Sequence, residues 1–291
     1  IGTGGRNLAN QVPGGGTWKF PGSGTPLFGV RQDVTFAGME NFNNQLAFGS
    51  AGSVAANTSA PWVKYVDLVS GEVVEFLAYE SSFRGGVQVL TADITDATGF
   101  GAPDGIPEII TAPGRGRAPE VRVFTTAGVE LTRYRQMVYA TNNLNGVNIA
   151  VGNIDADVLP ELIVVPQRGV VEVRVFDIVA GNADPITNNP LYRFNAFAKS
   201  FIGGAAVGAG DIDGDGRSEI VVGSGSGTAA SVVVFNPAVN FPAVIAPNAA
   251  TPANPPIAWA KYTGFFNAKF LGGISSVSVG QINGGAADII V

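Results

Sequence analysis

One short stretch of the sequence, Asp211-Ile-Asp-Gly-Asp-Gly-Arg-Ser-Glu219, places carboxylates at positions one, three, five and nine. The alternate spacing allows a tightly curled loop to direct three Asp side chains at one point, and the two glycines supply the backbone angles that such a curl requires. So many hard oxygen donors favour Ca²⁺ over Mg²⁺, which keeps more water, or Zn²⁺, which prefers nitrogen and sulfur. The candidate ligands are Asp211, Asp213, Asp215, the main-chain carbonyl of Arg217, and Glu219.

The loop differs from an EF-hand in its last ligand and in its flanks. An EF-hand carries a bidentate Glu at position twelve, and this position is Val222. The flanking segments, Val207-Gly-Ala-Gly210 and Ile220-Val-Val-Gly223, predict short strands rather than helices. A single acidic loop is often only a solvated turn, so its interpretation depends on the rest of the chain.

The acidic loop recurs along the chain, which favours the metal-site interpretation. Residues 153–161 match it position for position, and residues 93–108 form an expanded copy. More degenerate copies run from 281 to 288 and from 33 to 45, where calcium binding is doubtful. The additional candidate ligands are Asn153, Asp155, Asp157, the carbonyl of Leu159, Glu161, Asp93, Asp104 and Glu108.

A segment of small residues precedes each loop at a nearly constant interval. Measured at the third residue of each segment, the steps are 57 (30 to 87), 60 (87 to 147), 58 (147 to 205) and 69 (205 to 274). A fixed period of this size indicates a repeat architecture. The last step is longer because of a Pro/Ala/Asn-rich segment, Asn236 to Pro256.

These repeats resemble FG-GAP repeats, also called VCBS-type repeats, as in the propeller of the integrin alpha chain. The resemblance covers nearly the whole chain, and it is most specific in the second to fourth repeats. It implies a β-propeller with Ca²⁺ in the turn between the first two strands of a blade, but it does not fix the function. The "FG" element is echoed at Phe28-Gly29, Ile202-Gly203 and Leu271-Gly272, and the "GAP" element at Thr111-Ala-Pro-Gly114, Val165-Pro166 and Val222-Gly-Ser224.

We therefore expect one all-β domain over residues 1–291, a β-propeller of four-stranded antiparallel blades. Five blades of about 58 residues fit the length and the period. The two ends suit one blade, because Asp288-Ile-Ile-Val291 followed by Ile1-Gly-Thr-Gly4 resembles Glu219-Ile-Val-Val-Gly-Ser-Gly225. A fragment of a longer propeller, for instance of seven blades, is the alternative. The expected repeats are 27–84, 85–144, 145–202 and 203–271, with 272–291 plus 1–26 completing a shared blade.

Composition limits the chemistry that the chain can perform. Cysteine and histidine are both absent, so thiol chemistry is excluded and the commonest general base is missing. The net charge of −6 argues against a nucleic-acid partner, and no run of eighteen apolar residues predicts a membrane span. Paired carboxylates such as Asp155 and Asp157 are better explained as metal ligands than as a glycosidase pair.

Two further features have ordinary explanations that compete with functional ones. Five arginines in the second repeat suit an anion site, but alternating Glu and Arg on outer strands more often form a solvated cross-strand ladder. The three tryptophans suit sugar stacking, but packing between blades is the simpler account. The residues are Arg115, Arg117, Arg122, Arg133 and Arg135, and Trp18, Trp62 and Trp259.

We expect a non-catalytic, calcium-stabilised interaction or structural module, secreted or at the cell surface. A carbohydrate-binding propeller lectin is the alternative, and a propeller enzyme is the weakest hypothesis. Residues 220–291 and 1–30, the low-charge sector, carry only five charges, at Arg6, Lys19, Lys261, Lys269 and Asp288. Depletion of charge with Phe, Trp, Pro and Ile is typical of the core of a protein contact. We expect this sector to dock on a second copy or another protein; a glycosylated neutral surface is the alternative.

Overall fold

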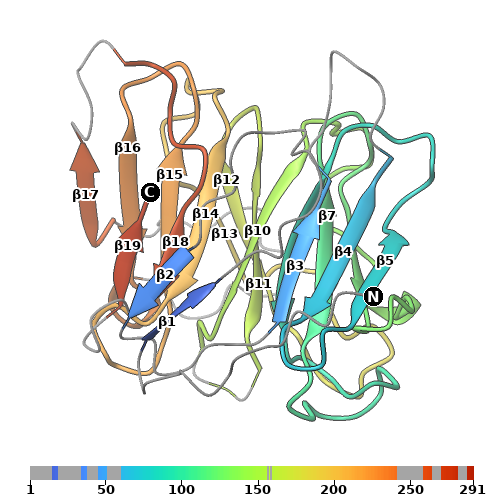
Figure 1. Ribbon diagram of the computed structural model, residues 1–291. Coiled ribbons are helices and arrows are strands. Elements are labelled where there is room, and N and C mark those ends of the chain that lie inside the picture. The colour runs from blue at the N-terminus through green and yellow to red at the C-terminus, as the bar shows by residue number, and fades with distance from the viewer. Residues whose placement is uncertain are drawn as a thin grey trace.

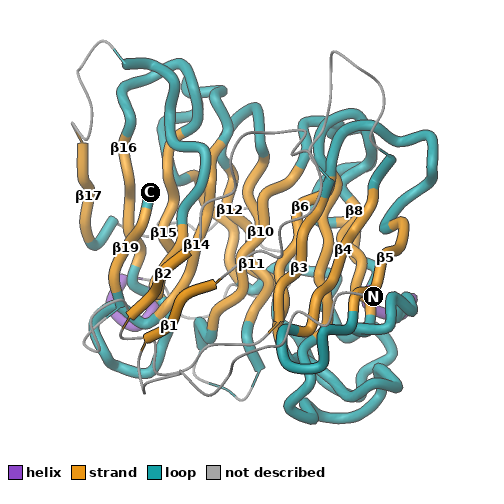
Figure 2. Tube along the Cα trace, in the orientation of Figure 1, coloured by secondary structure: helices purple, strands orange, loops and turns teal. Residues whose placement is uncertain are grey.

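The chain folds into β-sheets with almost no helix, as expected from the sequence. The computed structural model describes residues 15–18, 34–37, 45–50, 60–155, 157, 159–240, 258–263, 270–280 and 287–291, with only the backbone at 15–18, 34–37 and 240. Within these ranges the helical segments are a 3₁₀ turn at Thr132–Tyr134 and α1 at Pro237–Asn240 (Figure 2).

Three complete four-stranded antiparallel sheets form the centre of the molecule, and in each the strands follow chain order. Figure 1 shows them side by side with their strands roughly upright. They fall within the second, third and fourth predicted repeats. Their strands are β6 (Val87–Ala92), β7 (Glu108–Pro113), β8 (Glu120–Phe124) and β9 (Gln136–Met137); β10 (Val147–Gly152), β11 (Glu161–Pro166), β12 (Glu172–Phe176) and β13 (Tyr192–Asn195); and β14 (Ala205–Gly210), β15 (Glu219–Ser224), β16 (Ser231–Phe235) and β17 (Ala260–Thr263).

The described residues form smaller sheets at the two ends of the chain. β3 (Gln45–Gly49), β4 (Trp62–Asp67) and β5 (Val73–Leu77) make a three-stranded sheet in the first repeat, where four strands were expected. β18 (Ser278–Gly280) pairs with β19 (Asp288–Ile290). β1 (Gly15–Trp18) pairs with β2 (Val34–Ala37), and no pairing joins β1 to β19 among the described strands. The shared blade and the count of five therefore stay predictions.

The arrangement of the sheets is propeller-like. The first strands of successive repeats, β6, β10, β14 and β18, lie next to one another in series. The second strands, β7, β11 and β15, are buried along their whole length. They are covered on both faces, which explains their nearly continuous apolar sequences.

Side chains from the second strands enter two different cores. In β11, Leu162 and Val164 pack toward the second-repeat sheet, and Ile163 and Val165 pack toward the fourth-repeat sheet. Successive side chains of a strand point to opposite faces, so each sheet contributes to the core on either side of it. This alternation holds the sheets in a fixed order and orientation.

A polar bridge joins the second- and third-repeat sheets at their outer strands. The hydroxyl of Tyr139 donates to the carbonyl of Glu172 (2.6 Å). The guanidinium of Arg174 lies over the Tyr139 ring, 4.6 Å from its centroid, and donates to the carbonyl of Val138 (2.8 Å). Cation–π and charge-assisted hydrogen bonds gain strength when they are shielded from water, as here.

An equivalent polar bridge, formed by Tyr79 and Arg122, joins the first and second repeats. Tyr79 donates to the carbonyl of Glu120 (3.0 Å), and Arg122 donates to the carbonyl of Ala78 (3.2 Å) while lying over the Tyr79 ring. Arg122 is also paired with Glu120 at 2.7 Å, and its side chain is only 16% exposed. The expected Glu/Arg ladder is present, but at this arginine it is largely shielded from water and links two repeats.

The tryptophans differ from expectation. Trp62 and Trp259 are 48% and 43% exposed, so packing between blades does not account for them. The side chain of Trp18 lies outside the described residues. Also outside them are residue 33 with 38–44 of the degenerate loop 33–45, residues 281–286 of the loop 281–288, and residues 241–256 of the Pro/Ala/Asn-rich segment.

Candidate metal centres

Each acidic loop connects the first strand of a sheet to the second. In the fourth repeat the loop lies between β14 and β15, and in the third repeat between β10 and β11. The residue at position nine, Glu219 or Glu161, begins the second strand and is fully buried. The buried second strand therefore fixes the position of the glutamate carboxylate, and the loop supplies the aspartate carboxylates.

The fourth-repeat loop is curled around Asp211. The carboxylate of Asp211 accepts hydrogen bonds from the backbone amides of Gly214 (2.7 Å) and Gly216 (3.0 Å). Both glycines have positive φ, 81° and 88°, and a Cβ on either would meet open space. The requirement for glycine is therefore one of backbone angle, as the sequence predicts. The amide of Ile212 donates to Oε2 of Glu219 (2.7 Å).

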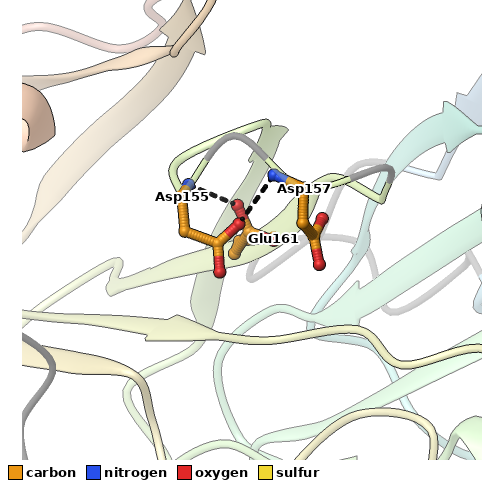
Figure 3. Close-up of side chains that lie close together, drawn as sticks. All are labelled: Asp155, Asp157 and Glu161. Atoms are coloured by element: carbon orange, nitrogen blue, oxygen red, sulfur yellow. Dashed lines mark hydrogen bonds between the residues drawn. The ribbon is translucent and has the colours of Figure 1, made fainter.

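The third-repeat loop has the same curl with a different set of ligand positions (Figure 3). The amide of Asp157 donates to Oδ1 of Asp155 (3.1 Å), and the amide of Asp155 donates to Oε2 of Glu161 (3.3 Å). Asn153, at position one, donates from its side chain to the carbonyl of Asp157 (2.8 Å). Leu159 is held by its amide, which donates to Oδ1 of Asp157 (2.8 Å).

Both loops bring three carboxylates together. Each cluster offers three oxygen atoms that lie within 4.8 Å of one another, so each could hold a metal ion. Positions three and nine take part in both clusters, position one only in the fourth repeat and position five only in the third. Asp215 lies outside its cluster. The clusters are Asp155, Asp157 and Glu161, and Asp211, Asp213 and Glu219.

The buried carboxylates of Glu161 and Glu219 favour a bound cation. Oε1 of Glu161 and Oε1 of Glu219 are both buried and without a hydrogen-bond donor in the structure. Burying a carboxylate oxygen without a partner is costly, and a cation between the carboxylates would remove that cost. The donor set, hard oxygens with several negative charges, suits Ca²⁺.

The pKa shifts in these loops have the same origin. Burial, together with the charges of Asp155 and Asp157, raises the pKa of Glu161 to about 8, although the hydrogen bond from the amide of Ile154 acts to lower it. Burial likewise raises the pKa of Glu219, with contributions from the Asp residues of its loop. Like charges held close together in a poorly solvated place favour protonation when no cation is bound.

The second-repeat loop is arranged differently. Asp93 accepts from the amides of Asp104 (3.2 Å) and Gly105 (2.8 Å), and Glu108 accepts from the amides of Ile94 and Thr95. Burial, together with the charges of Asp93 and Asp104, raises the pKa of Glu108 to about 7. Among the described residues, Asp93, Asp104 and Glu108 do not form a cluster as tight as the other two. Metal binding here stays a prediction.

The sequence reasoning missed one position that adjoins each loop. It is the residue after the Phe that ends the third strand: Asp177 in the third repeat and Asn236 in the fourth. Asn236 donates to Oδ2 of Asp213 (2.7 Å). Burial raises the pKa of Asp177, and the charges of Asp155 and Asp157 raise it further. The signal was available in the sequence, in the recurring Val-x-Val-Phe of the third strands.

Comparison with known families identifies one of the repeats. Residues 203–237 match the family model of the FG-GAP repeat, which confirms the resemblance seen in the sequence. The matched segment contains β14, the loop 211–218, β15 and β16. No curated protein matches the chain. No helix among the described residues has the length and apolar character needed to cross a bilayer.

Proposed function

We propose that this FG-GAP repeat protein is a non-catalytic, calcium-stabilised interaction module that works outside the cell or at its surface. The observation that carries the proposal is the pair of acidic clusters, each built on a buried glutamate with an unpartnered oxygen. In each cluster Ca²⁺ would neutralise carboxylates that otherwise repel one another. The ion would tie the loop to the buried second strand.

The ligand assignments follow from position. In the fourth repeat the side chains of Asp211, Asp213 and Glu219 hold the ion, with Asp215 and the carbonyl of Arg217 completing the shell. In the third repeat the ligands are Asn153, Asp155, Asp157, the carbonyl of Leu159, and Glu161. In the second repeat they are Asp93, Asp104 and Glu108.

A substitution in the fourth-repeat loop separates a structural role from a catalytic one. Asp213→Ala removes one carboxylate from the cluster and the acceptor of the Asn236 side chain. We expect a lower melting temperature in Ca²⁺, with ligand binding retained once Ca²⁺ is saturating. Loss of an enzymatic turnover at an unchanged melting temperature would instead support a catalytic role for the loop.

The extracellular assignment rests on the family. FG-GAP repeats are typical of extracellular proteins that bind other proteins, and the high free Ca²⁺ there suits exposed loops of modest affinity. The absence of cysteine and histidine supports a non-catalytic role. Blotting of secreted and cytoplasmic fractions from the native source checks the location, and retention in the cytoplasm would contradict it.

The low-charge sector, residues 220–291 and 1–30, is the proposed docking surface for a second copy or another protein. Several exposed apolar side chains lie in its described part, which together with the low charge suits a protein contact. Sedimentation of the purified chain, with and without residues 238–256, tests self-association. A strict monomer at high concentration, unchanged by the deletion, would exclude it. The exposed side chains are Val239, Trp259, Tyr262, Phe270, Leu271, Ile290 and Val291.

Glycan binding is the second candidate, and one hollow favours it. An open hollow of about 470 Å³ lies at the ends of the second strands, opposite the acidic loops, and is lined by Arg115, Gln167, Arg168, Ser200 and Ser226 among others. Arginine and amide side chains suit an acidic sugar. A glycan array separates the two candidates: binding lost in Arg168→Ala supports a lectin, and no binding leaves the protein-interaction proposal.

A further inference from the structure

Asp177 lies beside Glu161 across two neighbouring strands. Leu162 of β11 is opposite Phe176 of β12, so the next pair outward along the two strands is Glu161 with Asp177. Directly opposed residues of antiparallel strands have Cβ atoms roughly 4.5–5.5 Å apart. The backbone of Asp177 is held in place by the amide of Thr187, which donates to its carbonyl (3.0 Å). Its position next to the acidic loop is therefore fixed by the sheet.

In the fourth repeat, an asparagine occupies the corresponding position. Ile220 is opposite Phe235, so Asn236 takes the same place beside Glu219. Asn236 is fully buried, and its amide donates to Oδ2 of Asp213 (2.7 Å). An Asn here supports the loop as a neutral hydrogen-bond donor. The third repeat replaces this donor with a carboxylate, which has nothing to donate when it is ionised.

The substitution leaves two unpartnered oxygens on adjacent strands. Oδ1 of Asp177 is buried without a hydrogen-bond partner, as is Oε1 of Glu161, and Glu161 is 0% exposed. Buried carboxylate oxygens without donors, here on two adjacent strands, are unfavourable unless a positive charge lies close by. Asp155, Asp157 and Glu161 form the tight cluster beside Asp177, and Asp177 adjoins that cluster without being part of it.

We propose that Asp177 is an additional cation ligand of the third repeat, binding from outside the acidic loop. The site then has four carboxylates from three segments: Asp155 and Asp157 from the loop, Glu161 from β11 and Asp177 from the end of β12. It then has as many carboxylates as the fourth-repeat loop, where Asn236 supplies no charge. This inference rests on the proposed calcium binding.

The experiment disables the other calcium sites and then replaces the Asp177 carboxylate by an amide. Asp211→Asn with Asp213→Asn removes two carboxylates from the fourth-repeat cluster, and Asp93→Asn with Asp104→Asn removes two from the second-repeat loop. Ca²⁺ binding is then measured by calorimetry with and without Asp177→Asn. Loss of an outer partner of a metal site typically costs about 10–100-fold in affinity. We expect a loss of at least this size for Asp177→Asn. Asp184→Asn, an exposed charge in the same connection, is the matched control and should change nothing.

The reciprocal change supplies a second measurement. Asn236→Asp, in the wild-type background, should lower the melting temperature in EGTA, because it loses the hydrogen bond to Asp213 and adds a charge. It should also enlarge the rise in melting temperature on adding Ca²⁺. Circular dichroism of each variant in saturating Ca²⁺ checks that the sheets are intact.

The outcomes separate this inference from the proposed function. If the wild type binds Ca²⁺ and Asp177→Asn binds it equally well, Asp177 is not a ligand and the inference is overturned. If Asp177→Asn raises the metal-free melting temperature but leaves the Ca²⁺ affinity unchanged, Asp177 and Glu161 share a proton, which also overturns it. If the wild type binds no Ca²⁺, the proposed function fails together with the inference.

Discussion

Glu161 and Glu219 have the same role in two separate sheets. Each begins a buried second strand, accepts a hydrogen bond from the loop backbone, and leaves one buried oxygen free for a cation. The loop alone does not produce this geometry. The strand register fixes the glutamate, and the positive-φ glycines or the Asx hydrogen bonds bring the aspartates to it.

A change at Glu161 should have opposite effects with and without metal. Above pH 8, where Glu161 is ionised, Glu161→Gln removes a buried charge that repels Asp155 and Asp157, so we expect the metal-free protein to become more stable there. The same change removes a ligand, so the gain in melting temperature on adding Ca²⁺ should shrink. Differential scanning calorimetry in EGTA and in Ca²⁺ measures both. Equal Ca²⁺-dependent gains in variant and wild type would contradict a ligand role.

The metal-free protein should lose stability as the pH rises. Folding raises the pKa of Glu161 to about 8 and that of Glu108 to about 7. The folded state therefore holds protons that the unfolded state releases near pH 4.5, and the free energy of unfolding falls between those values. Unfolding in urea with EGTA, from pH 5 to pH 8, measures the slope. A stability that rises over this range would contradict the assigned burial.

The sequence identifies the acidic loops but not the contacts that surround them. The D-x-D-x-D-G pattern identifies the loop at 211–219, and its recurrence identifies the one at 153–161. The pattern could not show that Asp215 stays outside its cluster, because that depends on how the loop curls. It also missed Asp177, which reaches the third-repeat loop through strand pairing rather than through nearby sequence.

At the scale of elements, the strands carry their own signals and the contacts between sheets do not. β8 (Glu120–Phe124) and β12 (Glu172–Phe176) alternate charged and apolar residues, the pattern typical of a strand. The role of Arg174 was not predictable from alternation, because its partner Tyr139 lies in the preceding repeat. Between the third and fourth repeats, Phe197 and Val233 stand at the corresponding positions, so apolar packing takes the place of the polar bridge.

Removing one hydroxyl tests the polar bridge. Tyr139→Phe leaves the ring under Arg174 but strips the donor from the carbonyls of Glu172 and Val164. An unsatisfied buried acceptor costs about 1–3 kcal/mol, so the free energy of unfolding should fall by that amount. Tyr262→Phe, at a half-exposed position, is the control. Equal stability of the two variants would show that the bridge contributes nothing.

At the scale of the whole molecule, the five-blade closure remains a prediction. The strands β6, β10, β14 and β18 lie in series, as in a propeller, but β1 pairs with β2 rather than with β19 among the described strands. The sequence predicts closure because the two ends resemble adjoining segments of the fourth repeat. Whether the two ends pair depends on the tertiary structure, because the segments lie almost a full chain length apart in the sequence.

Small-angle X-ray scattering tests the closure in solution. A closed, compact chain of this length has a radius of gyration of about 19 Å. We expect a value close to this in Ca²⁺, with a larger value in EGTA as the loops loosen. A radius well above it in Ca²⁺, for a protein shown to be monomeric by sedimentation, would contradict a closed propeller.

Calcium binding coupled to folding is the central claim, and one titration tests it most directly. The chain is stripped with EGTA and dialysed against Ca²⁺, its bound metal is counted by elemental analysis, and the melting temperature is followed at each concentration. We predict at least two Ca²⁺ per chain and stabilisation of about 2.7 kcal/mol per site when free Ca²⁺ is a hundred times the dissociation constant. A chain that binds no Ca²⁺, or binds it with no change in melting temperature, would contradict the claim.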